Sequence, residues 1–100
     1  MTRDAHAIDI ALVAETFKLL GDPTRLSILL ACLDAPRSVG DIATATGASP
    51  SLVSHHLRLL RGARLVSGTR DARQVFYQAA DQHVRHMIAD IVAHSAEAPR

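Results

Sequence analysis

Two predicted helices joined by a short glycine-containing turn constrain the fold of this chain more than any other feature. Ser38 can cap a helix over Val39–Thr46, and Gly47 is a residue type that ends helices. Ser49 can cap the next helix, which extends over about Pro50–Gly62 and has its proline at the first position. A helix, a brief turn and a second helix form a helix-turn-helix, so we expect a domain built around this motif.

Two further helices precede the motif. Apolar residues recur at three- and four-residue steps over Ile8–Leu20, which predicts an amphipathic helix that ends at Gly21. Asp22 can cap the following helix, and Pro23 suits its first turn. We expect this second helix to be almost entirely buried, because it carries a dense set of large aliphatic residues: Leu26, Ile28, Leu29, Leu30 and Leu33.

The pattern changes period after the motif. Leu65–Ser67 and Val75–Tyr77 have the composition of two short strands, with a polar turn at Gly68–Ala72 between them. Helical spacing returns from Asp81 to about Ala96. The predicted fold class is therefore mainly α, a winged helix-turn-helix with five helices and a two-stranded β-hairpin wing.

Composition limits the class of protein. One hundred residues, of which 48% are hydrophobic and 21% charged, suffice for one folded domain over 1–100. Cys32 is the single cysteine, so neither an internal disulfide nor a cysteine-rich metal site is possible. No signal sequence and no apolar run of membrane-spanning length is present, so we expect a cytoplasmic protein.

The net charge of +1 argues at first against a nucleic-acid partner, but the charge is unevenly distributed. From Ser51 to Gln74, five arginines against Asp71 alone give +4, which leaves −3 for the rest of the chain. Helical phase places apolar residues on one side of the 50–62 helix: Leu52, Val53, His56, Leu59, Leu60 and Ala63. The other side carries hydroxyls, an imidazole and guanidiniums, which suit base edges and phosphates.

We therefore expect double-stranded DNA as a partner, read by this helix and the wing. The candidate DNA-binding residues are Ser49, Ser51, Ser54, His55, Arg58, Arg61, Arg70 and Arg73. A solvated helix followed by an ordinary hairpin is the simpler alternative. His56 lies on the apolar side, so we expect a hydrogen-bonded interior histidine there. One motif of this size reads few base pairs, so we expect a homodimer formed through the terminal helices.

Four potential metal ligands share one side of the last predicted helix. At about 100° per residue from Asp81, the side chains of His83, Asp90, His94 and Glu97 lie between about 160° and 220°. His83 and His94 are separated by about 16 Å along the axis, so one chain cannot bring both to one zinc ion. Two antiparallel copies would place Asp81 and His83 opposite His94 and Glu97 of the partner subunit, which gives nitrogen and oxygen donors for zinc or cobalt.

Other ligand assignments remain open. His86 lies about 60° from His83 and can join or replace it as a ligand. Asp90 precedes His94 by one turn and can orient its ring by a hydrogen bond. His6 can add a ligand for an octahedral metal such as nickel. An ordinary polar helix face is the alternative for any single one of these residues.

The runs Leu19–Leu26 and Ser49–Leu57, followed by the wing with Tyr77, resemble the ArsR/SmtB family of winged-helix metal-sensing repressors over nearly the whole chain. The spacing of Asp81, His83, His94 and Glu97 is similar to the fifth-helix zinc site of that family. This resemblance implies a homodimer that binds operator DNA without metal and releases it when Zn(II), or Co(II) or Ni(II), fills two interprotomer sites.

Other functions remain as alternatives. Family members with a third-helix thiolate site carry cysteines where this chain has Ser38, Val39 and Gly40, so we do not expect sensing through that site. A repressor of the same fold that senses a non-metal signal, through Cys32 oxidation for example, is one alternative. A protein-interaction module with a structural zinc is another. No phosphate loop or nucleophile-and-base pairing is present, so we expect no enzyme.

Overall fold

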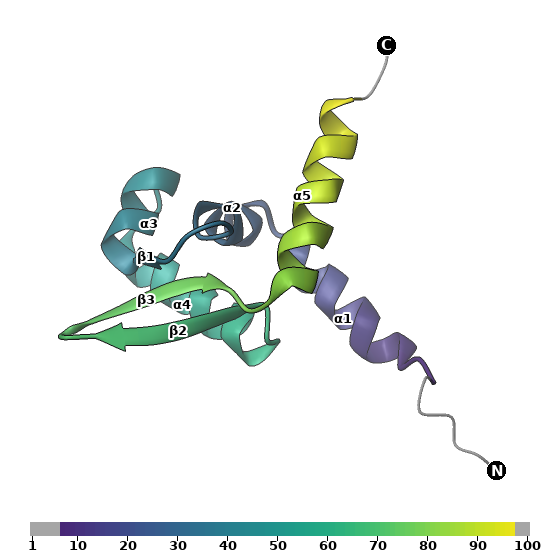
Figure 1. Ribbon diagram of the computed structural model, residues 1–100, viewed down its shortest axis with the longest axis horizontal. Helices are drawn as coiled ribbons and strands as arrows, with labels where there is room; N and C mark the ends of the chain where they lie inside the picture. Colours follow the sequence, from purple (N-terminus) through teal and green to yellow (C-terminus); the bar gives the residue numbers. More distant parts are fainter. Residues whose placement is uncertain (1–6, 98–100) are drawn as a thin grey trace.

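Five helices and three strands follow one another within residues 7–97, the part of the chain that the computed structural model describes (Figure 1). His6, one of the possible extra ligands, lies outside this part. The order is the one predicted for a winged helix-turn-helix, with one additional short strand before the motif. The elements are α1 (Ile10–Leu20), α2 (Pro23–Ala31), β1 (Arg37–Ser38), α3 (Val39–Thr46), α4 (Pro50–Gly62), β2 (Val66–Asp71), β3 (Gln74–Ala79) and α5 (Gln82–Ala96).

Side-chain caps fix the start of each helix. The three predicted N-caps, Asp22, Ser38 and Ser49, are confirmed, and Asp81 caps α5 in the same way. Each of the four accepts a hydrogen bond from the backbone N–H three residues later. Helix α1 begins two residues later than expected because Asp9 is its N-cap and accepts from the Leu12 N–H at 3.1 Å. Such caps are each worth about 1 kcal/mol, so local chemistry defines where these helices begin.

Gly47 sets the turn of the helix-turn-helix. Its φ of 77° lies in the left-handed region, where a residue without Cβ has no steric penalty. Its N–H donates to the Ala43 carbonyl at 2.8 Å, which closes the last turn of α3. Helix α4 begins three residues later, so this turn determines the direction in which α4 leaves α3.

The wing is longer than predicted and belongs to a three-stranded antiparallel sheet of order β1-β3-β2. The predicted turn at Gly68–Ala72 is wrong, because Gly68 to Asp71 continue β2 and the turn lies at Ala72–Arg73. Gly68 is in the strand for a packing reason. A Cβ at this position would lie 3.0 Å from Cε1 of Tyr77, its cross-strand partner, so glycine lets the aromatic ring lie against the backbone.

The core lies between α2, α3, α4 and the base of the wing. Its fully buried side chains are Ile28, Leu29, Cys32, Ile42, Val53, Leu57 and Leu60. Helix α2 is not buried on all sides, since Leu30 is 40% exposed. In α4 the buried stripe runs at steps of three and four through Val53, His56, Leu57 and Leu60. Leu52 lies about 90° from its centre and is 41% exposed, so the prediction for Leu52 was wrong and Leu57 was missed.

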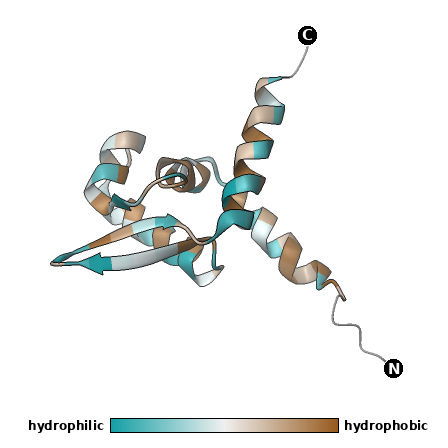
Figure 2. Cartoon of the chain, in the orientation of Figure 1, coloured by the Kyte–Doolittle hydropathy of each residue, from teal (hydrophilic) through white to brown (hydrophobic). Residues whose placement is uncertain are grey.

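The terminal helices leave much apolar surface uncovered. Helix α1 is largely hydrophobic along its length (Figure 2), yet Leu20 is its only buried residue. Both terminal helices lie at the end of the molecule opposite the wing tip (Figure 1). The exposed large hydrophobic residues of this region are Ile8, Ile10, Leu12, Val13, Phe17, Ile91 and Val92. A patch of this kind marks an interaction surface. No helix within 7–97 is long and apolar enough to cross a membrane.

Helix α5 is anchored to the core only near its start. The Ala79 N–H donates to the Cys32 carbonyl at 3.2 Å, and the Ala80 N–H donates to the Leu65 carbonyl at 3.0 Å. Val84 and Ile88 are the buried residues of α5. No residue of α5 after Ile88 is buried, and the C-terminal end of the helix points away from the rest of the chain (Figure 1).

Candidate functional site

The solvent-facing side of α4 carries the side chains expected to read DNA. The exposed ones are Ser51, His55, Arg58 and Arg61, whereas Ser54 is half-buried. Ser49, at the start of the helix, accepts from the Leu52 N–H at 3.1 Å through its hydroxyl oxygen and keeps its own proton to donate. Helical phase had assigned Leu52 to the core, but its side chain is exposed on this surface. An apolar side chain here can contact the methyl group of a thymine.

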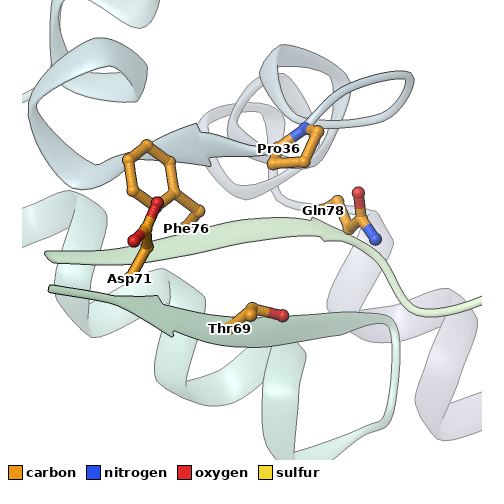
Figure 3. A pocket seen from close by; sticks show the side chains of 5 residues that line it. All are labelled: Pro36, Thr69, Asp71, Phe76 and Gln78. Carbon is orange, nitrogen blue, oxygen red and sulfur yellow. The ribbon is translucent and has the colours of Figure 1, made fainter.

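Strand alternation divides the wing into two different faces. The face that includes the buried residues Val66 and Ala79 also carries Arg70 and Tyr77. Arg73 lies in the turn at the wing tip. The opposite face holds a hollow of about 410 Å³ lined by Pro36, Thr69, Asp71, Phe76 and Gln78 (Figure 3). Asp71, the one acidic residue within 51–74, therefore lies on the other face of the sheet from Arg70.

His56 is the interior histidine that the sequence predicted. It is 7% exposed, and its Nδ1 accepts a hydrogen bond of 3.2 Å from Nε of Arg25. The same guanidinium donates to the Leu19 carbonyl at 3.0 Å, and Asp22 lies 4.0 Å from the Nε2 atom of His56. Burial lowers the pKa of His56; the positive charges of Arg25 and, more weakly, His55 lower it further, while Asp22 opposes them.

The α5 residues expected to bind metal are all exposed, namely Asp81, His83, His94 and Glu97, together with His86 and Asp90. Asp81 uses one carboxylate oxygen, Oδ1, to accept from the Val84 N–H at 3.0 Å. Within residues 7–97 of a single chain, no three histidine, cysteine, aspartate or glutamate side chains form a group able to hold a metal ion.

Cys32 is a core residue. It has no exposed surface, its Sγ donates to the Ile28 carbonyl at 3.5 Å, and burial raises the pKa of its thiol to about 11. A thiol in this state is almost fully protonated at neutral pH, whereas oxidation requires an accessible thiolate. The structure therefore disfavours the alternative in which Cys32 is a redox sensor.

Known proteins are similar to this chain in sequence and in fold. A family model described as "Bacterial regulatory protein, arsR family" matches residues 22–67. The HTH-type transcriptional repressor SmtB of Mycobacterium tuberculosis is 37% identical over 83 residues, 83% of this chain and 62% of the relative. The regulator KmtR of the same species is 38% identical over 89 residues, 89% of this chain and 68% of the relative. The regulator NmtR is 41% identical over 85 residues, 85% of this chain and 71% of the relative.

Solved structures agree in fold. The homodimeric winged helix-turn-helix DNA-binding domain of a possible ArsR-family regulator from Mycobacterium bovis superposes with a TM-score of 0.82 at 29% identity, over 94% of this chain and 92% of that one. The solution structure of apo-NmtR superposes with a TM-score of 0.80 at 37% identity, over 98% and 85%. The fold and its basic helix thus define a winged helix-turn-helix protein.

The chain belongs to the ArsR/SmtB family of bacterial regulatory proteins, as the sequence resemblance indicated. It spans about 62% of the length of the SmtB repressor. The relatives named above are described as transcriptional regulators, the class that the sequence resemblance implied.

Proposed function

We propose that this chain is a metal-responsive transcriptional repressor, active in the cytoplasm, which binds operator DNA as a homodimer and releases it when metal binds. Zn(II) is the main effector in this proposal, with Co(II) or Ni(II) as the alternatives. One observation carries the proposal: α5 exposes His83, His94 and their neighbouring carboxylates on the same helix as the uncovered apolar residues Ile91 and Val92. A second copy of α5 would complete the set of metal ligands and would also cover these apolar residues.

DNA binding rests on α4 and the wing. The hydroxyl of Ser51 and the imidazole of His55 are exposed and can hydrogen-bond to base edges in the major groove. Arg70 and Arg73, on the wing, are suited to phosphates of the flanking backbone. Because one α4 contacts few base pairs, two copies related by a two-fold axis would read half-sites about one helical turn apart.

The dimer surface is the exposed apolar patch of α1 and α5. Phe17 and Ile91 are among its large side chains, and a hollow between the two helices is lined almost entirely by apolar residues. Burial of apolar surface contributes about 25 cal/mol per Å², so covering this patch favours association. The patch lies at the opposite end of the molecule from the wing tip, which leaves the wing and α4 free for DNA (Figure 1).

The donor set on α5 fits a divalent ion of borderline softness. His83 and His94 offer imidazole nitrogens, and Asp81 and Glu97 offer carboxylate oxygens, which together match zinc and cobalt better than copper(I). Asp81 keeps its Oδ2 available while Oδ1 caps the helix. The metal would supply a charged crosslink between subunits, with Asp81 and His83 from one chain and His94 and Glu97 from the partner subunit.

Metal and DNA affinities must be coupled in both directions if this proposal holds. Metal that favours a dimer geometry unsuited to DNA lowers the affinity for operator, and operator lowers the affinity for metal by the same factor, typically about 5–150-fold. The test is fluorescence anisotropy with a labelled duplex selected in vitro by the metal-free chain, repeated with Zn(II), Co(II) and Ni(II). Release by at least one metal supports the proposal. An unchanged affinity with all three would refute it.

A further inference from the structure

A polar hollow lies where α4, the candidate DNA-recognition helix, meets the wing. It has a volume of about 290 Å³ and is lined by Ser54, Leu57, Arg58, Arg61 and Tyr77. Leu57 is 1% exposed and belongs to the core, so it forms an apolar floor. The remaining four side chains offer two guanidinium groups and two hydroxyl groups, all of which can donate hydrogen bonds.

The hollow carries positive charge without a compensating carboxylate. Within residues 7–97, no aspartate or glutamate lies within ion-pair distance of Arg58 or Arg61. Asp71, the acid nearest in sequence, lies on the opposite face of the sheet, where it lines the hollow of Figure 3. Positive donors converging on a small space without an acid select a compact anion, and guanidinium groups match phosphate oxygens in particular.

Tyr77 is held in place by its strand partner. Gly68 pairs with Tyr77 across β2 and β3, and the absence of a side chain at Gly68 leaves room for the aromatic ring, because a Cβ there would lie 3.0 Å from its Cε1 atom. Tyr77 therefore reaches the α4 residues from a separate element, and the hollow exists only because helix and wing contribute to it together.

We infer that this hollow binds one phosphate of the DNA backbone in each half-site, held by Arg58 and Arg61 through charge and by Tyr77 and Ser54 through hydroxyl donors. The inference rests on the proposed function and adds Tyr77 as a DNA-binding residue. Because one phosphate touches both α4 and β3, it fixes the angle at which α4 enters the groove.

Methylphosphonate substitution tests this site. A duplex selected in vitro by the wild-type chain is made with one neutral methylphosphonate at a time. We expect one position in each half-site where the substitution weakens wild-type binding about tenfold, the effect of removing a charge-assisted hydrogen bond. At that position Tyr77→Phe should cause no additional loss, although on unmodified DNA it weakens binding to a similar degree.

Salt dependence separates the charged donors from the neutral ones. Arg61→Gln should flatten the slope of log K against log salt by about 0.9 for each phosphate that the variant no longer neutralises. Tyr77→Phe should leave this slope unchanged because the phenol carries no charge. Gln78→Ala is the control, since Gln78 neighbours Tyr77 but lies on the opposite face. Tyr77→Phe keeps the ring on Gly68, and Ser54→Ala gives a second, independent variant.

Three results would overturn the inference, and they point to different causes. Wild-type affinity for unmodified DNA in both Tyr77→Phe and Ser54→Ala would exclude the hollow while leaving the proposed function intact. Saturable binding of inorganic phosphate that Tyr77→Phe abolishes, with DNA affinity unchanged, would assign the hollow to a free anion. A wild-type chain that binds no duplex even at low salt would overturn the proposed function itself, and the DNA phosphate with it.

Discussion

The guanidinium of Arg25 joins His56 on the recognition helix to the last turn of α1. Its Nε donates to Nδ1 of His56 at 3.2 Å, and a terminal nitrogen donates to the Leu19 carbonyl at 3.0 Å. The recognition helix is thereby tied, through one side chain, to a helix that carries the uncovered apolar patch. Because Nδ1 accepts this bond, His56 is neutral with its proton on Nε2, which faces Asp22.

Removal of this link should destabilise the fold. Arg25→Met keeps most of the aliphatic stem but leaves the buried Nδ1 of His56 without a donor, so we expect the free energy of unfolding to fall by about 1–3 kcal/mol. Urea denaturation followed by circular dichroism measures the decrease. Arg58→Met, at an exposed site, is the matched control and should change stability by less than about 0.5 kcal/mol. Equal stability of the two variants would show that the link contributes nothing.

Stability should fall as the solution becomes acidic around the ordinary pKa of histidine. Burial and Arg25 lower the pKa of His56 in the folded chain below the ordinary value of 6.5. As the pH drops through 6.5, the unfolded chain takes up this proton first, so the free energy of unfolding decreases until the folded imidazole is protonated too. The groups that face His56 are Arg25, Asp22 and His55. Urea midpoints across this range measure the effect, and His56→Asn should lose this component of the pH dependence.

The wing arginines should contribute affinity without sequence preference. Arg70→Gln and Arg73→Gln each remove a positive charge from the wing, so the salt dependence of DNA binding should become shallower by about 0.9 for every phosphate left without its arginine. The ranking of different operator sequences should stay the same because phosphates carry no base identity. Competition binding with selected and scrambled duplexes at several salt concentrations measures both. A changed sequence ranking would mean that these side chains reach base edges.

His94→Ala should uncouple metal from DNA. The side chain is exposed near the end of α5 and contributes nothing to the core, so metal-free DNA affinity should match that of the wild type. Addition of Zn(II) should no longer release the duplex, because the interprotomer site lacks one nitrogen donor. Ser95→Ala, at the adjacent exposed position, is the control and should respond to zinc as the wild type does. Loss of DNA binding by metal-free His94→Ala would indicate a structural role instead.

Acid should also weaken the metal response. Histidine ligands bind metal only when deprotonated, so protons compete with the metal and the zinc concentration needed for release should rise as the pH falls. Titrations of the labelled complex with zinc at several pH values measure this shift. A response that is independent of pH would exclude imidazole ligands.

Local chemistry explains why so much of the fold could be predicted. A cap such as Ser49 and a terminator such as Gly47 act on backbone groups within a few residues, so their effect is readable from sequence. Gly68 misled the prediction because a glycine that accommodates a cross-strand ring has the same sequence signature as a glycine in a turn. β1 was missed because two residues carry no periodicity.

The candidate site was predictable only where it follows from one helix. The exposed polar residues of α4 follow from helical phase, whereas the hydrogen bond between Arg25 and His56 joins positions 31 residues apart and has no sequence signature. Tyr77 was missed as a DNA-binding candidate because its place beside Arg58 depends on how the wing folds back over α4. The α5 ligands need a second copy, so a single chain leaves them as a prediction.

The manner in which α5 is held has a mechanical consequence. It is clamped at its base by the Ala79 and Ala80 hydrogen bonds and by two buried side chains, while the eight residues from Ala89 to Ala96 extend about 12 Å beyond that clamp. A small rotation at the base of α5 therefore gives a larger displacement at its end: a tilt of about 5° moves the far end by about 1 Å over this length. The hydrogen bonds at the base of α5 are accepted by the carbonyls of Cys32 and Leu65, which adjoin α2 and the wing. A displacement of α5 at His94 would therefore be transmitted to α2 and the wing, the elements that support α4.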